Sequence, residues 1–118
     1  MKKKRILVIG GLAAGPSAAA KAARTNPNVE VTLFEASETV SYGICEAPYV
    51  IGGLIPDETK LVVYTPEQLK EERGFDVKIL HRVEKIYPSK HRLAVRDIRR
   101  NEFVEYEYDK IIIATGSV

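Results

Sequence analysis

A glycine turn near the start of the chain holds the residues best suited to bind a charged ligand. Residues 6–9 are apolar, the segment 10–15 contains three glycines, and an alanine-rich segment begins at Pro16. A buried strand, a tight turn and a helix N-terminus together can receive phosphate groups, because the free N–H groups of the first helical turn point at the anion. Pro16 suits that first turn, where a missing N–H group costs nothing. The pattern therefore predicts a phosphate-binding turn.

An acidic residue follows at the distance expected of a nucleotide-binding carboxylate. The segment 30–35 is a second apolar strand pattern, and it ends in Glu35, 20 residues (35 − 15) after Gly15. A carboxylate at this place can accept hydrogen bonds from a ribose. Leu12 departs from the usual glycine spacing, so a glycine turn without a ligand remains the alternative. The order of strand, turn, helix, strand and acid favours a dinucleotide site.

Cys45 is the only cysteine in the chain. One cysteine excludes an internal disulfide and a four-cysteine zinc site, and we expect no metal. A lone thiol can still form a mixed disulfide with a small thiol, or a sulfenic acid. Pro48 allows a short helix over residues 46–52, whose N-terminus would favour the Cys45 thiolate. Glu46 opposes this by like-charge repulsion, and a small buried side chain is the alternative interpretation.

Composition sets the class of protein. The 118 residues suffice for one domain, with 45% hydrophobic and 29% charged residues. A net charge of +2 is too small to indicate nucleic acid or a membrane surface as a partner. The basic start at residues 2–5, followed by an apolar run, could mimic a signal peptide, but Gly10, Gly11 and Pro16 break the run. We interpret it as the first strand of a cytoplasmic protein.

The hydrophobic pattern predicts an α/β fold. The first unit is a strand at 5–10, a helix at 14–26 ended by the Asn26–Asn28 turn, and a strand at 30–35 that lies parallel to the first. Thr65 and Gln68 form a capping box that starts a helix, which Gly74 closes. Strands are expected at 75–80 and 82–87, with a hairpin of 93–97 and 103–106. The apolar run 110–114 predicts a central parallel strand that is buried on both faces.

Four segments together resemble one family: residues 8–15, 41–53, 65–67 and 108–116. The chain is similar to the N-terminal FAD-binding segment of a pyridine nucleotide-disulfide oxidoreductase of the single-cysteine branch. That branch contains coenzyme A disulfide reductases, NADH oxidases and NADH peroxidases. The resemblance covers essentially the whole chain. It implies a Rossmann-like FAD-binding domain over residues 1–118, with a βαβ unit, a parallel central sheet and a β-meander, incomplete relative to the full family.

The resemblance also implies FAD as the cofactor. The helix after Gly15 would face the pyrophosphate, Glu35 the adenosine ribose, and the backbone of Val83 the adenine. The cofactor-contacting residues that it implies are Gly10, Gly11, Leu12, Ala13, Ala14, Gly15, Glu35, Ala36, Val83, Ala114, Thr115 and Gly116.

The implied reaction reduces a small-molecule disulfide or persulfide, with coenzyme A disulfide as the leading candidate. Electrons would pass from NAD(P)H through FAD to Cys45. Dithiol relatives carry a second cysteine where this chain has Val50, and the family usually has Asn and Gly where Ile44 and Glu46 flank the cysteine. Ala13 stands where the family's oxidases and peroxidases carry a histidine, which favours the coenzyme A disulfide reductases.

Further residues are candidates for the substrate. Lys21 and Arg24 lie three residues apart on one helix face and would meet the phosphates of coenzyme A, although an ordinary solvated face explains them equally well. Ser41 and Tyr42 are further candidates for substrate binding; Tyr42 or Tyr49 would line the flavin or thiol pocket, with core packing as the alternative interpretation. We interpret the two histidines, His81 and His91, as solvated or structural.

Full-length members of the family carry an NAD(P)H domain and a dimerisation domain after this segment, and we expect neither within residues 1–118. We therefore expect no turnover from these residues alone, and a homodimer only for a longer parent. Two alternatives remain open. One is a non-catalytic dinucleotide-binding module. The other is an inactive truncated fragment whose open strand edge, beside the first strand or residues 111–114, pairs with another chain.

Overall fold

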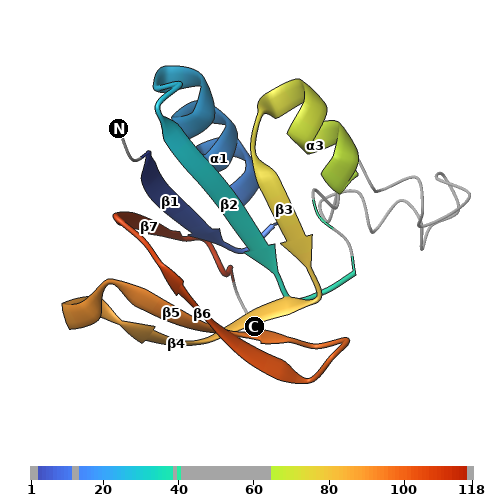
Figure 1. Ribbon diagram of the computed structural model, residues 1–118. Helices are drawn as coiled ribbons and strands as arrows, with labels where there is room; N and C mark the ends of the chain where they lie inside the picture. Colours follow the sequence, from blue (N-terminus) through green and yellow to red (C-terminus); the bar gives the residue numbers. More distant parts are fainter. Residues whose placement is uncertain (1–2, 12–13, 39, 41–64, 117–118) are drawn as a thin grey trace, which may run out of the picture.

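The computed structural model describes residues 3–11, 14–38, 40 and 65–116. One sheet is parallel, with neighbouring strands in the order β3 (Asp76–Ile79), β2 (Val29–Glu35), β1 (Lys4–Ile9) and β7 (Lys110–Ile113). The other is an antiparallel meander of β4 (His81–Tyr87), β5 (Arg92–Asp97) and β6 (Glu102–Glu107). Figure 1 shows two helices beside the parallel sheet, α1 (Ala14–Thr25) and α3 (Pro66–Arg73). The expected α/β fold, with a parallel sheet and a meander, is confirmed.

The first βαβ unit forms where the sequence predicts it. β1 and β2 are parallel neighbours, with Ile6 opposite Val31 and Val8 opposite Leu33. α1 ends at Thr25, and the Asn26 side chain accepts a hydrogen bond from the Asn28 N–H group at 2.9 Å, which turns the chain. Pro16 lies buried in the first turn of α1.

The capping signals around α3 are also confirmed. The Thr65 hydroxyl accepts a hydrogen bond from the Gln68 N–H group at 3.2 Å, and the Gln68 side chain accepts one from the Thr65 N–H group at 2.9 Å. Gly74 ends the helix in the left-handed conformation with φ of 78°. The chain then enters β3, which pairs in parallel with β2.

The meander follows β3 directly. β4 and β5 are connected by the short 3₁₀ helix η3 (Pro88–Lys90), and β5 and β6 form the expected hairpin. The register between β4 and β5 shifts between Val83 and Lys85, which marks a β-bulge.

The position of β7 differs from the expectation. It pairs in parallel with β1, with Leu7 opposite Ile111, but it is the outermost strand of the described sheet and not a central one. Ile113 is 62% exposed, so the strand is not buried on both faces. A continuous apolar run predicts that both faces of a strand are covered, but it does not say whether the strand has a neighbour along each edge. In the described part of the chain, β7 pairs along one edge only, with β1. The open edge expected beside β1 or residues 111–114 therefore falls on β7, since β1 has a neighbour on each side.

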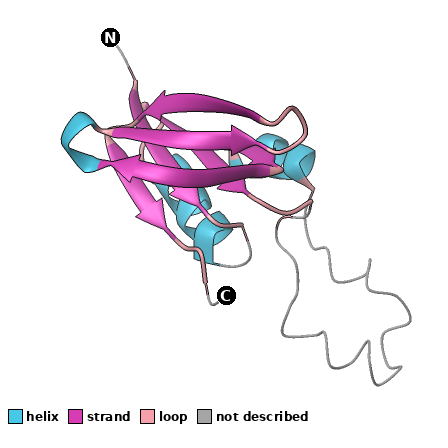
Figure 2. Ribbon diagram, turned by 90° about the horizontal axis from the view of Figure 1, so that it is seen from below, coloured by secondary structure: helices cyan, strands magenta, loops and turns pink. Residues whose placement is uncertain are grey.

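Apolar clusters cover both faces of the parallel sheet, and Figure 2 shows the meander lying across it. Successive residues of β1 point to opposite faces, so Val8 joins one cluster while Leu7 and Ile9 join the other. This two-sided burial explains the unbroken apolar run at residues 6–9. The buried residues on the helix side are Val8, Ala19, Val31, Leu33, Val40, Leu69 and Phe75. Those on the meander side are Leu7, Ile9, Phe34, Leu93, Val95 and Tyr108.

Among the described residues, no helix is both long and apolar enough to cross a membrane.

The packing of the core predicts how much stability the chain loses when a buried side chain beneath the glycine turn is shortened. Leu33 is fully buried, with 0% exposure, and we expect Leu33→Ala to lower the free energy of unfolding by about 2–5 kcal/mol. Val104 on β6 is 45% exposed, and Val104→Ala serves as the control with an expected loss below about 1 kcal/mol. Urea unfolding followed by circular dichroism measures both. Equal losses would contradict the placement of the core.

Candidate nucleotide-binding site

The carboxyl ends of three parallel strands meet at one edge of the sheet. The Gly10 N–H group, just after β1, donates a hydrogen bond to the Phe34 carbonyl of β2 at 2.9 Å. The Ala114 N–H group, just after β7, donates to the Ile9 carbonyl at 2.8 Å. In open parallel sheets this is the edge at which ligands bind.

Two glycines at this edge allow backbone segments to approach closely, and a third makes room for neighbouring side chains. Gly10 has φ of +107°, and a Cβ atom there would collide with the carbonyl oxygen of Ala114. A Cβ atom on Gly15 would overlap the carbonyl oxygen of Gly10. At Gly11 it would lie 2.8 Å from Cγ2 of Val40. The turn therefore admits no side chain at these positions, and the extra glycine at Gly11 has a packing reason.

The Glu35 carboxylate is fixed by three hydrogen bonds at the end of β2. Oε1 accepts from the Gly11 N–H group at 2.9 Å. Oε2 accepts from the Ser37 N–H group at 2.8 Å and from the Ser37 hydroxyl at 2.7 Å. Since an ionised carboxylate offers about four acceptor positions, it retains capacity for a further donor. Glu35 therefore joins the glycine turn to the segment after β2, and its orientation is set without a ligand.

A cavity of about 220 Å³ opens beside this carboxylate. It brings together five of the residues predicted from the sequence, which come from the ends of β1, β2 and β7 and from β4. Its size matches one part of a dinucleotide and not the whole, since sites for entire drug-sized ligands span about 300–1,000 Å³. The lining residues are Ile9, Gly10, Phe34, Glu35, Ala36, His81, Arg82, Val83 and Thr115.

Four of the lining residues were missed by the sequence analysis: Ile9, Phe34, His81 and Arg82. Ile9 and Phe34 belong to buried strands and carry no polar signal. His81 lies two residues before Val83 on β4, so both side chains share one face, and this spacing could have pointed to it. The structural interpretation of His81 is supported by a hydrogen bond, since His81 Nδ1 lies 2.8 Å from the Ile79 carbonyl oxygen.

Other predicted residues lie outside the cavity or outside the described residues. Lys21 and Arg24 are exposed on α1 and do not line it. Ala14 begins α1, and Gly116 has φ of +71° with open space around its Cα atom. The predicted site residues that lie outside the described ranges are Leu12, Ala13, Ser41, Tyr42, Cys45 and Tyr49.

A larger cavity of about 450 Å³ lies at the opposite end of β1. It is lined by the basic residues around Lys4 and by the turn around His91. Because it borders the amino end of β1, it lies away from the edge at which parallel sheets bind ligands. The smaller cavity beside Gly10 and Glu35 is therefore the candidate site.

Comparison with known proteins agrees with this geometry. Residues 4–118 match the family model described as pyridine nucleotide-disulphide oxidoreductase. The chain is 37% identical over 115 residues to an NAD(P)H sulfur oxidoreductase (CoA-dependent) of Pyrococcus abyssi, covering 98% of this chain and 25% of that protein. It is 32% identical over 113 residues to a coenzyme A disulfide reductase of Staphylococcus aureus, covering 96% of this chain and 26% of that protein.

The fold is also that of a solved oxidoreductase. The water-forming NADH oxidase of Lactobacillus brevis, bound to NADH, matches with a TM-score of 0.91 at 28% identity, over 98% of this chain and 26% of that chain. The parallel sheet, the glycine turn and the acid-ended second strand define a Rossmann-like α/β domain. The chain belongs to the pyridine nucleotide-disulphide oxidoreductase family. It spans about a quarter of the length of the curated relatives it matches.

The close backbone contact at the turn predicts a large effect of one methyl group. Gly10 and Gly74 both have positive φ, but only Gly10 has another backbone where a Cβ atom would lie. We expect Gly74→Ala to cost about 1–2 kcal/mol of stability from backbone strain alone. Gly10→Ala should cost distinctly more, because it also forces residue 10 and Ala114 apart.

Urea unfolding of the two variants measures the difference. Equal midpoints for Gly10→Ala and Gly74→Ala would contradict the close approach of the glycine turn to Ala114.

Proposed function

We propose that residues 1–118 form the FAD-binding segment of an NAD(P)H-dependent oxidoreductase, and that the cavity beside Glu35 takes the adenosine end of FAD. The observation that carries the proposal is the shared cavity of Gly10, Glu35, Val83 and Thr115, which four separate segments of the chain contribute. A cavity of about 220 Å³ suits an adenosine and leaves the rest of the cofactor to extend past the glycine turn.

The residues present fit this cofactor. The fixed Glu35 carboxylate can accept a hydrogen bond from a ribose hydroxyl. The first turn of α1 contains no acidic side chain, so its positive end is available to a pyrophosphate. The backbone of Val83 would face the adenine, and Ala114, Thr115 and Gly116 would pass beside the flavin half.

When bound, FAD supplies the electron transfer between a pyridine nucleotide and a disulfide. The chain's own contribution is to hold and orient the cofactor, and to offer Cys45 to the substrate. In the proposed exchange the Cys45 thiolate attacks one sulfur of a small disulfide, the S–S bond breaks, and one thiolate leaves. The product is a mixed disulfide between Cys45 and the substrate.

Coenzyme A disulfide is the leading substrate in this proposal. Two relatives over 30% identical are named for coenzyme A disulfide or for coenzyme A dependence. Ala13 in place of a histidine supports the same choice over the oxidases and peroxidases of the branch. NAD(P)H binding and dimerisation are proposed for a longer parent, because the chain covers only 25–26% of those relatives.

A non-catalytic dinucleotide-binding module is the second candidate. The small volume of the cavity allows it equally, since an adenosine is common to FAD, NAD and AMP. Titration of the chain with each of the three separates the candidates: FAD should bind most tightly under the first proposal. Similar affinities for all three would favour the second.

Replacement of the Glu35 charge tests the ribose contact. Glu35→Gln keeps an oxygen for the Gly11 N–H group but removes the charge, and we expect FAD affinity to fall about tenfold, the usual effect of losing one charge-assisted hydrogen bond. Glu30→Gln is the matched control, because Glu30 is exposed at the far end of the same strand. Flavin fluorescence titration measures both dissociation constants. Equal affinities for the two variants would remove Glu35 from the site.

Mass spectrometry tests the role of Cys45. We expect the wild-type chain, incubated with coenzyme A disulfide, to gain the mass of one coenzyme A in a mixed disulfide that dithiothreitol reverses. Cys45→Ser should gain nothing, because it removes the only thiol. An unmodified wild-type chain after prolonged incubation would argue against thiol exchange at Cys45.

A further inference from the structure

A left-handed corner connects the parallel sheet to the meander. Leu80, between β3 and β4, has φ of +55°, a conformation that residues other than glycine adopt rarely. Its N–H group donates to the Ser37 carbonyl at 3.0 Å, and its carbonyl accepts from the Ile98 N–H group at 2.9 Å. Ser37 also bonds the Glu35 carboxylate. The corner is therefore tied to the segment after β2 and to the end of β5.

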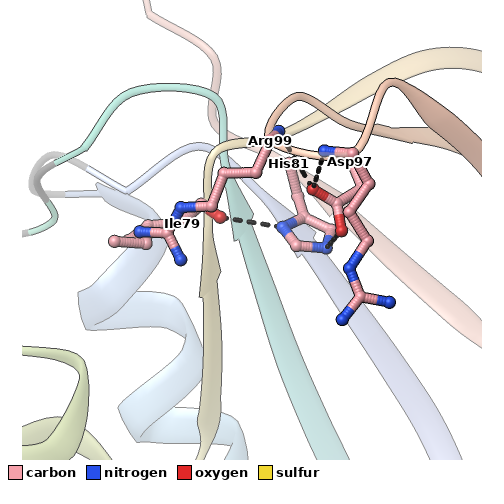
Figure 3. Close-up of polar contacts among 5 residues, drawn as sticks. Ile79, His81, Asp97 and Arg99 are labelled. Atoms are coloured by element: carbon pink, nitrogen blue, oxygen red, sulfur yellow. Dashed lines mark hydrogen bonds and ion pairs between the residues drawn. The ribbon is translucent and has the colours of Figure 1, made fainter.

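His81 spans this corner with its side chain. Nδ1 lies 2.8 Å from the Ile79 carbonyl oxygen and, because a carbonyl only accepts, this nitrogen must carry the hydrogen. Nε2 lies 3.8 Å from Oδ2 of Asp97. The other oxygen of Asp97 accepts from the Arg99 N–H group at 3.1 Å, so the carboxylate is itself fixed by the turn after β5. Figure 3 shows the imidazole ring between the Ile79 carbonyl and the Asp97 carboxylate.

The same ring forms part of the cavity wall. His81, Arg82 and Val83 line the cavity from β4, opposite Glu35. The ring of Phe34, also in the wall, lies 6.4 Å from the His81 ring between centroids. Only 21% of the His81 side chain is exposed, so its position is set by protein contacts and not by solvent.

We propose that His81 is a positioning residue for the adenine end of the bound nucleotide. Its bond to the Ile79 carbonyl closes the Leu80 corner, and the ring packs between this carbonyl and Asp97. The first residues of β4, including the backbone of Val83, are thereby kept at a fixed distance from Glu35. This inference rests on the proposed function, because the ligand is the adenosine end of FAD. The role that it assigns to His81 does not require His81 to contact the ligand.

Three substitutions separate the contributions of the ring. His81→Leu removes both nitrogens and leaves the Ile79 carbonyl without its donor. His81→Asn restores an N–H group near the place of Nδ1. His91→Leu is the control, since His91 is the other histidine of the meander region but does not line the cavity.

The experiment uses two readouts on the full chain. Amide hydrogen exchange of Leu80 and Ile98, both bonded at the corner, reports its closure without any ligand. Flavin fluorescence titration with FAD reports binding. We expect His81→Leu to speed exchange at both amides about tenfold and to weaken FAD binding by a similar factor, as the loss of one buried hydrogen bond predicts. His81→Asn should remain within about threefold of wild type in both readouts, and His91→Leu should change neither.

Three results would overturn the inference: unchanged exchange in His81→Leu, faster exchange with unchanged FAD affinity, or no rescue by His81→Asn. If His81→Leu fails to fold, His81→Gln takes its place, because it keeps an N–H group near Nε2 only. It is compared with the wild type by the same two readouts, amide exchange and FAD titration. Failure of the wild-type chain to bind FAD is a different outcome. It would refute the proposed function, and with it the nucleotide role of His81, even if exchange showed that the ring holds the corner.

Discussion

The structure depends on the close approach of three backbone segments at the end of β1. The carbonyl of Ala114 faces Gly10, and the carbonyl of Gly10 faces Gly15, at separations that leave no room for a side chain. These contacts hold β7 against β1 and pack the N-terminus of α1 against the glycine turn. The parallel strand ends therefore form a small edge at which backbone segments lie in direct contact, without side chains between them.

A chain of hydrogen bonds carries this constraint to the meander. Gly11 bonds Glu35, Glu35 bonds Ser37, and Ser37 bonds Leu80 at the corner between β3 and β4. The acid at the end of β2 is thus a structural residue before it contacts any ligand. Its hydrogen bonds fix the orientation in which a ribose would find it, which lowers the entropy lost when a ligand binds.

The sequence predicted those features that local chemistry decides. The Thr65–Gln68 capping box, the glycine after α3 and the glycine turn each act within a few residues, so their signals were readable. The edge position of β7 was not readable, because an apolar run says that faces are covered but not which strand lies beside it. The place of His81 in the cavity wall was missed for a similar reason: its neighbours there, Ile79 and Asp97, are set by the corner after β3 and by the meander register.

The charge at Glu35 has a consequence for the choice of nucleotide. A carboxylate that is held by three donors can still accept a hydrogen bond from a ribose hydroxyl, whereas a phosphate on the same ribose would meet its negative charge. Under the proposed function, this carboxylate therefore favours an adenosine whose ribose carries free hydroxyls, as in FAD. If FAD occupies this cavity as proposed, this carboxylate does not meet the pyridine nucleotide and does not choose between NADH and NADPH. In the proposed enzyme that choice belongs to a second nucleotide site, because the adenosine of FAD occupies this one.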